Sequence, residues 1–294
     1  MIARRNDFAL FFTVSFISAW VLACGPWLDG KGLSSLWLRP GAAMMMFTPA
    51  LGVLAVWNYR RRTWRELAVE TGAMLGPRPH CTLWLTAAAW LGTPLFLWIA
   101  FGLSAVFGLY RFSFDFVSSD VAAVVVVEAL TLSTIGTLPF ALGEEVGWRG
   151  WLLPHLAGRL GPGAAVAASG VIWGLWHAPL TLLGYNYPNL GAWAAPAFLG
   201  FCLPFGAILG WLRLHTGSIW PCVVAHAAFN ASTGVFSSFE SLDRRANPLL
   251  AGFGLVGWAV LVLLAVALYM RHPIRARPPV PQAVPLGRPQ PSLR

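Results

Sequence analysis

Charged residues are scarce in this sequence of 294 residues. Asp, Glu, Lys and Arg make up 11% of the chain, whereas hydrophobic residues make up 57%. An ordinary soluble domain carries roughly 25% charged residues, so this composition excludes a typical water-soluble domain. Long apolar runs take the place of charge, and many of them are long enough to cross a lipid bilayer.

Several common signatures are also absent. The four cysteines, Cys24, Cys81, Cys202 and Cys222, form no CxxC pair, so the sequence indicates neither a zinc knuckle nor a disulfide framework. No GxSxG or HExxH motif occurs, which argues against a serine hydrolase elbow and a zincin helix. No internal repeat of the kind found in many transporters is visible.

The apolar runs predict an all-α, polytopic integral membrane protein with about eight transmembrane helices. Short loops separate the runs, and no stretch resembles a water-soluble domain, so residues 1–270 are predicted to form a single membrane-embedded domain. The predicted spans are 8–28, 41–57, 82–109, 121–148, 165–187, 191–212, 219–236 and 249–270.

The distribution of basic residues predicts that both termini are cytoplasmic, in a multi-pass protein of the inner or plasma membrane. This orientation places most of the 20 Lys and Arg residues on the inside, as the positive-inside rule requires. Those left outside are Lys31, Arg39, Arg111, Arg244 and Arg245. The Arg-rich, Lys-poor basic set is typical of a bacterium with a GC-rich genome.

The two ends of the sequence differ in composition from the apolar runs between them. Residues 271–294 are rich in Pro and Arg and are predicted to form a disordered cytoplasmic tail. At the other end, Arg4 and Arg5 precede the first run, and residues 21–24 loosely resemble a lipoprotein cleavage site. A cleaved signal peptide is therefore an alternative, but the loss of one span would break the charge partition.

Ionisable residues within spans are costly and therefore functional candidates. Glu144 and Glu145 occur in the fourth predicted span, and Arg149 follows Glu145 at an i,i+4 spacing that favours an ion pair. Glu144 would then point about 100° away around the helix, free to act as a general acid or base. The plainer alternative is a helix-end ion pair at the level of the lipid headgroups.

Two further groups lie in the fifth and seventh spans. His177 is followed by Pro179, which predicts a kink and a free carbonyl beside the imidazole, although a lone buried His is more often structural. His226 and Asn230 share one helical face and present two hydrogen-bond donors, which suits an oxyanion site. The alternative is that these polar side chains only hold neighbouring helices together. We expect the three groups to meet in an intramembrane cavity on the cytoplasmic half.

The order EExxxR, an aromatic residue four places before His, and HxxxN resembles the CPBP intramembrane proteases, which include CAAX prenyl endopeptidases and Abi-type proteins. The resemblance implies that Glu144 and His177 activate a water molecule and that His226 and Asn230 bind the oxyanion. Glu145, Arg149 and Trp173 would support them; Trp173 stands where the family usually has Phe. The implied substrate is a membrane-associated, prenylated or leader-type peptide, and no nucleic acid is expected as a partner.

Two alternatives stay open. A catalytic zinc ion held by Glu144, His177 and His226 would give a metalloprotease, whereas the favoured scheme needs no cofactor. Asn230 is a poor zinc ligand, which weighs against the metal. A transporter or scaffold that binds lipid would also keep a few polar residues at mid-membrane.

Overall fold

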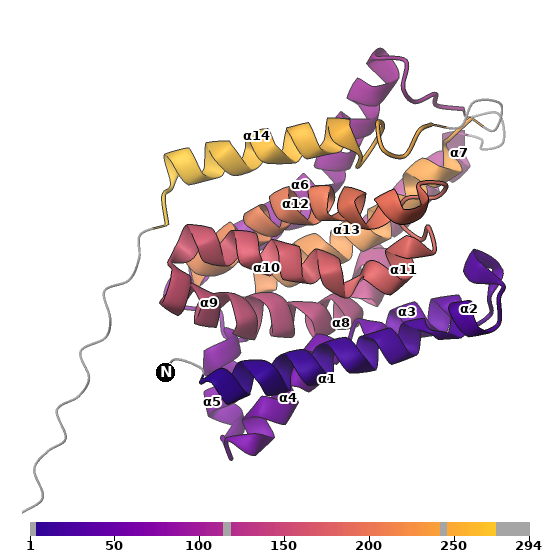
Figure 1. Ribbon diagram of the computed structural model, residues 1–294. Coiled ribbons are helices and arrows are strands. Elements are labelled where there is room, and N and C mark those ends of the chain that lie inside the picture. The colour runs from indigo at the N-terminus through magenta and orange to yellow at the C-terminus, as the bar shows by residue number, and fades with distance from the viewer. Residues whose placement is uncertain (1–3, 114–118, 242–245, 275–294) are drawn as a thin grey trace, which may run out of the picture.

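Helices joined by short loops account for most of the computed structural model, which describes residues 4–113, 119–241 and 246–274 (Figure 1). Among these residues there is no extended strand, and a single isolated bridge pairs Phe112 with Glu240. The prediction of an all-α membrane protein is confirmed. Most of the tail predicted to be disordered, residues 275–294, lies outside the described residues.

Each predicted span contains at least one longer helix. These helices are α1 (Arg5–Ala23), α4 (Thr48–Tyr59), α6 (Pro79–Val106), α8 (Thr134–Glu145), α10 (Pro162–Trp176), α12 (Ala194–Thr216), α13 (Trp220–Ser238) and α14 (Leu255–Arg271). Shorter pieces extend or connect them: α2 (Gly25–Leu28), η1 (Gly32–Ser34), α3 (Leu38–Met45), α5 (Trp64–Thr71), α7 (Ser119–Glu128), η2 (Ala129–Ser133), η3 (Val146–Leu152), α9 (Leu153–Leu160), α11 (Ala178–Leu182) and η4 (Gly191–Trp193).

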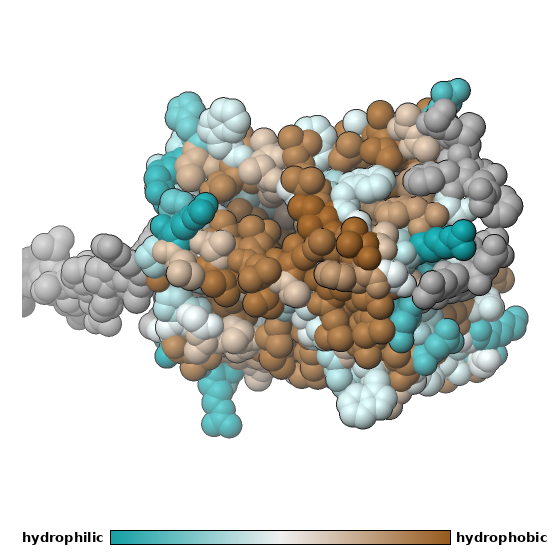
Figure 2. Space-filling view, turned by 90° about the horizontal axis from the view of Figure 1, so that it is seen from above, coloured by the Kyte–Doolittle hydropathy of each residue, from teal (hydrophilic) through white to brown (hydrophobic). Residues whose placement is uncertain are grey.

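Within the described residues, five helical stretches are long and apolar enough to cross a membrane. They are Arg5–Leu28, Leu38–Tyr59, Pro79–Val106, Asp120–Leu160 and Gly191–Thr216, and two shorter apolar helices, α10 and α14, accompany them. On the face seen in Figure 2, a broad hydrophobic band covers the middle of the molecule, and most of the polar residues lie towards its two ends. Exposed apolar side chains such as Leu36, Trp84 and Val106 belong in lipid rather than in water.

The fourth span does not end where the sequence predicted. Instead of stopping at residue 148, the helix continues through η3 and α9 to Leu160, and η3 is a π-helical segment. Glu144 and Glu145 therefore lie inside a continuous helical stretch and are 1% and 0% exposed. The alternative of a helix-end ion pair among lipid headgroups is wrong, because this segment is buried among other helices.

The fifth span is shorter and more broken than predicted. α10 ends at Trp176, His177 forms a turn, and the five-residue α11 follows, so the helix does not run to residue 187. Pro179 lacks the N–H that would bind the Leu175 carbonyl, which explains the break. The kink predicted beside His177 is thus present as a full interruption of the helix.

Small residues let the helices that carry the motifs approach their neighbours closely. Gly143 lies against the backbone of Met46, and Gly147 lies against Pro49 at the start of α4. On α10, Gly170 and Gly174 face α12 in the same manner. α13 packs against α6, α8 and α12, and α10 packs against α12 and η3, so the three motifs lie on neighbouring elements.

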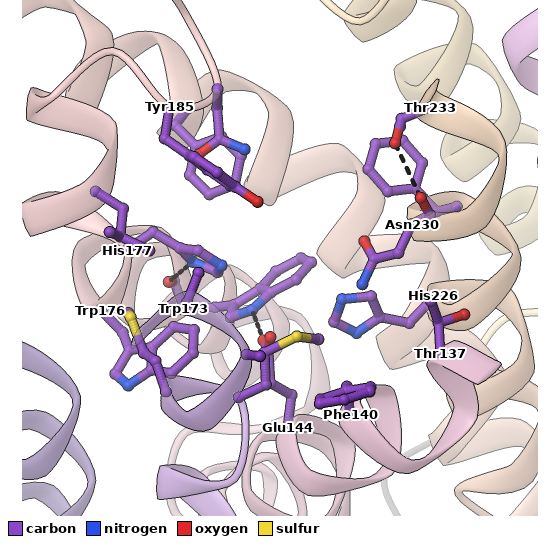
Figure 3. Close-up of a pocket in the computed structure, with 18 of the residues that line it drawn as sticks. Thr137, Phe140, Glu144, Trp173, Trp176, His177, Tyr185, His226, Asn230 and Thr233 are labelled. Atoms are coloured by element: carbon purple, nitrogen blue, oxygen red, sulfur yellow. Dashed lines mark hydrogen bonds between the residues drawn. The ribbon is translucent and has the colours of Figure 1, made fainter. Parts of the chain in front are cut away.

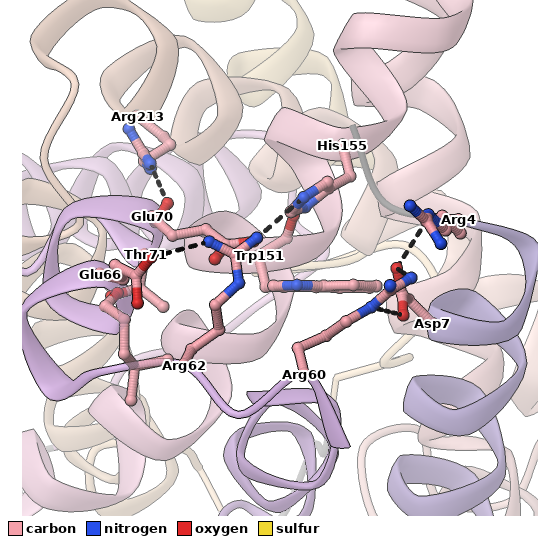
Figure 4. A network of polar contacts seen from close by, with 11 residues as sticks. Arg4, Asp7, Arg60, Arg62, Glu66, Glu70, Thr71, Trp151, His155 and Arg213 are labelled. Carbon is pink, nitrogen blue, oxygen red and sulfur yellow. Dashed lines mark hydrogen bonds and ion pairs between the residues drawn. The ribbon is translucent and has the colours of Figure 1, made fainter. Parts of the chain in front are cut away.

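A second group of polar residues lies at the end of the bundle that carries the N-terminus (Figure 4). Arg60 donates from Nε and Nη2 to the two carboxylate oxygens of Asp7, both at 2.7 Å. The Nε2 of His155 lies 3.2 Å from Glu70 Oε1. These pairs join α1, the loop after α4, α5 and α9, and α1 is packed against α4 as part of the bundle.

Candidate active site

A cavity of about 500 Å³ lies between α3, α8, the α10–α11 break, α12 and α13. Glu144, Trp173, His177, His226 and Asn230 all line it. Trp173 and His177 approach from one side, His226 and Asn230 from the other, and Glu144 from α8 between them (Figure 3). The structure therefore brings together the residues that the three sequence motifs contain.

Glu144 is held by Trp173. The indole Nε1 of Trp173 donates to Glu144 Oε2 at 2.7 Å. The phenyl ring of Phe has no such donor, so Trp at this position adds a contact that the sequence did not predict. Among the described residues, this is the only side-chain hydrogen bond recorded for the Glu144 carboxylate.

Glu145 has a different task from its neighbour. Its Oε1 accepts from Arg149 Nη1 at 2.9 Å, which confirms the predicted i,i+4 ion pair, and the same oxygen lies 2.9 Å from His226 Nδ1. Because an ionised carboxylate only accepts, His226 Nδ1 must carry the proton. Glu145 therefore fixes the orientation of His226 from a helix 81 residues earlier in the chain.

Arg149 fills the space beneath Trp173. Its guanidinium carbon lies 4.2 Å from the centroid of the indole ring, a cation–π arrangement. Gly206 on α12 leaves room for the guanidinium, and Arg213 Nε donates to the Arg149 carbonyl at 3.0 Å. This carbonyl lies in π-helical η3, a type of segment that often occurs at functional sites.

His177 presents one ring nitrogen for chemistry. Its Nδ1 lies 2.9 Å from the Trp173 carbonyl, and because a carbonyl only accepts, Nδ1 must donate. In the neutral ring Nε2 is then an acceptor. The interruption of the helix at His177 is what allows the ring to enter the cavity beside Trp176 and Phe198.

The three candidate metal ligands do not form a metal site. The ring centroid of Trp173 lies 5.7 Å from that of His177 and 5.5 Å from that of His226, so the indole ring contacts both imidazoles. Across residues 4–113, 119–241 and 246–274, no three His, Cys, Asp or Glu side chains lie close enough together to hold one ion. The donor set required by the zinc alternative is not assembled.

Sequence reasoning missed much of the cavity wall. Phe198 and Phe201 on α12 and Phe229 on α13 line it, with Phe201 and Phe229 stacked at 4.9 Å. Arg39, at the start of α3, also lines it. The Phe spacing on α12 is typical of any buried helix face, so it gives no specific signal. For Arg39, the charge distribution predicts only a position on the non-cytoplasmic side of the membrane.

Residues 126–232 match the family of type II CAAX prenyl endopeptidases described as Rce1-like. A CAAX prenyl protease 2 of Methanococcus maripaludis is 25% identical to the chain over 229 residues, which cover 75% of the chain and 82% of that protein. The matched segment contains every motif residue from Glu144 to Asn230. Together with the helical membrane fold, these similarities support the resemblance of the chain to the CAAX prenyl endopeptidases, a family of intramembrane proteases.

Proposed function

We propose that the protein hydrolyses a peptide bond with a water molecule activated by Glu144 and His177, without a metal ion. The observation that carries this proposal is the position of Glu144, a buried carboxylate that faces a cavity and receives one hydrogen bond from a neutral donor. Such a carboxylate retains lone pairs that can bind a water molecule and accept its proton.

In the proposed reaction, Glu144 both accepts the proton of the water molecule and returns it to the product. Glu144 removes a proton from the water while His177 Nε2 accepts a hydrogen bond that orients it, and the hydroxide adds to the carbonyl carbon of the substrate. The C–N bond of the tetrahedral intermediate then breaks, and Glu144 returns the proton to the leaving amine. No side-chain nucleophile is required.

His226 and Asn230 are proposed to bind the oxyanion of that intermediate. In the imidazolium form, with Nδ1 donating to Glu145, His226 presents an N–H at Nε2 towards the cavity. Asn230 lies one helical turn further along α13 and lines the same cavity, so its amide offers a second donor.

The proposed substrate is a peptide that enters from the membrane. The cavity wall is largely aromatic and aliphatic, which suits apolar peptide side chains or a lipid-modified residue. The name of the Methanococcus relative refers to CAAX prenyl substrates, and a prenylated peptide is accordingly the first candidate. A leader-type peptide of a membrane-associated protein is the second.

The test is cleavage of quenched fluorescent peptides, prenylated and unprenylated, by the protein purified in mild detergent. Glu144→Gln should abolish cleavage, and a zinc chelator should leave the wild-type rate unchanged. Glu128→Gln is the matched control, because Glu128 is an exposed carboxylate on the same helical stretch that accepts from Ser133, outside the cavity. Folded wild-type protein that cleaves no peptide, or that loses activity with chelator, would contradict the proposal.

A further inference from the structure

The residues that line the cavity extend from the motif residues in one direction along the bundle. On α8 the lining runs from Glu144 back to Thr137, a separation of about 10 Å along the helix, and on α13 it runs from His226 on to Gly234. α8 continues through η3 into α9, whose His155 belongs to the polar group at the N-terminal end of the bundle. On α8 the lining therefore leads away from the N-terminal end.

The neighbouring elements give the same direction. α13 begins at the N-terminal end, where the indole of Trp220 donates to the carbonyl of Ala73 just after α5. Its lining residues therefore also lead away from that end. α3 lines the cavity from Met46 back to Arg39, and the helix that follows it, α4, ends beside Arg60 of the polar group. The lining on α3 again leads away from the N-terminal end.

Burial changes along the cavity in the same direction. Glu144 and His226 are buried, whereas Tyr185 and Gly234 are exposed. Figure 3 shows Tyr185 on the opposite side of the cavity from Glu144. The motif residues thus form the floor of the cavity, and Tyr185 and Gly234 lie at its mouth.

Large side chains of η3 close the floor towards the N-terminal end. Trp148, Arg149 and Trp151 are all buried. Trp148 packs against Trp176 of the cavity wall, with ring centroids 5.7 Å apart, and Trp151 lines the smaller cavity beside the polar group. Among the described residues, none lines both cavities. In this part of the chain, the larger cavity therefore opens away from the N-terminal end.

The distribution of charge assigns a side of the membrane to each end of the bundle. Arginines gather at the N-terminal end, which the positive-inside rule places in the cytoplasm. Those described there are Arg4, Arg5, Arg60, Arg61, Arg62, Arg65, Arg78, Arg159, Arg213 and Arg271. The described basic residues at the end with the mouth are Lys31, Arg39 and Arg111. The mouth accordingly faces the non-cytoplasmic side.

We infer that the substrate enters the cavity from the non-cytoplasmic side of the membrane and is a translocated segment of a membrane-anchored chain. The direction of entry depends on the fold and on charge, whereas cleavage of the segment rests on the proposed function. The largely apolar cavity wall suits side chains that come from the bilayer. Carbonyls within an intact helix are already hydrogen-bonded, so the cleaved segment is one that unwinds where a chain leaves the membrane.

The first test labels single cysteines with a membrane-impermeant maleimide in sealed vesicles. The background carries Cys24→Ala and Cys81→Ala, because these two native thiols are not buried. Tyr185→Cys at the mouth should be labelled in right-side-out vesicles and should lose this labelling in inverted ones. Arg65→Cys, at an exposed position of α5, is the matched control and should show the opposite pattern. Labelling of Tyr185→Cys from the cytoplasmic face would overturn the inference.

The second test measures cleavage of a quenched peptide joined to a large hydrophilic carrier that cannot cross the bilayer. Right-side-out vesicles of wild-type protein should cleave it, whereas inverted vesicles should cleave it only after detergent is added. Cleavage by sealed inverted vesicles and not by right-side-out ones would overturn the inference. Labelling of Tyr185→Cys from the non-cytoplasmic face, without cleavage of any peptide even in detergent, would support the direction of entry and contradict only the proposed reaction.

Discussion

The cavity around Glu144 and the polar network around Asp7 both contain carboxylates. Those of the network are paired with basic side chains, whereas Glu144 is not. In the network, the two oxygens of Asp7 receive two bonds from Arg60, and Glu70 faces His155. In the cavity, Glu144 receives a single recorded bond, from an uncharged donor. The network also borders a smaller cavity, of about 240 Å³, so the presence of a cavity does not distinguish the two regions.

The difference supports the proposal that the cavity, and not the network, is where the chemistry takes place. A carboxylate that is saturated by a guanidinium has little capacity left to take a proton, and its role is to join helices. A buried carboxylate with free lone pairs is costly unless something binds it. Within the site, Glu145 is paired through Oε1 with Arg149 and His226, although its Oε2 has no hydrogen-bond partner, whereas Glu144 contacts no cationic donor.

The largest expected effect separates Glu144 from Asp7. Glu144→Gln should lower kcat/KM by about 10³-fold or more, because it removes the proposed general base, and should leave the melting temperature in detergent nearly unchanged. Asp7→Asn should do the reverse: it weakens the contact with Arg60 and lowers stability while activity stays within about twofold. Peptide cleavage and thermal unfolding of both variants measure this. Equal losses of activity in the two variants would contradict the different roles assigned to Glu144 and Asp7.

The proposed oxyanion donors should give the next largest effect on activity. Asn230→Ala should lower kcat about 10²-fold with little change in KM, because the amide is proposed to act on the intermediate. Thr233→Val is the control: Thr233 lines the same cavity one turn further on, and its hydroxyl donates to the Asn230 carbonyl rather than facing the proposed oxyanion. A KM effect without a kcat effect for Asn230→Ala would assign it to substrate binding.

A smaller effect is expected for Trp173→Phe. The change removes the bond from the indole to Glu144 while it keeps an aromatic ring over Arg149, so kcat should fall about tenfold and KM should stay constant. Trp176→Phe, on the same helix, removes an indole that donates to Thr48 and not to Glu144. If both variants lose kcat equally, the contribution of Trp173 is packing alone.

The sequence predicted which motif residues meet at the cavity better than the geometry that connects them. The i,i+4 spacing of Glu145 and Arg149 was sufficient to predict their ion pair, because one helix fixes that distance. The contact between Glu145 and His226 was not predictable, because it depends on how α8 and α13 pack. The extent of the fourth span was missed for a related reason: η3 and α9 are stabilised by burial against other helices, and no local signal ends the helix near residue 148.

The smallest effect concerns the pH dependence of stability at the network. Glu70 lies in α5, outside the apolar spans, and the hydrogen bond with His155 holds the pKa of its carboxyl below the usual value. Because the pKa is lower in the folded state, this contact stabilises the fold above about pH 4.3, and the stabilisation is lost as the pH falls through the folded-state pKa.

Glu70→Gln should therefore be slightly less stable than wild type at pH 7, by less than about 1 kcal/mol, and the difference should vanish at low pH. Unfolding in detergent at pH 7 and pH 3 measures it, with cleavage at pH 7 expected to stay within about twofold. A stability difference that is the same at both pH values would mean that Glu70 acts through packing, and a large loss of cleavage would mean that the network and the catalytic cavity are coupled.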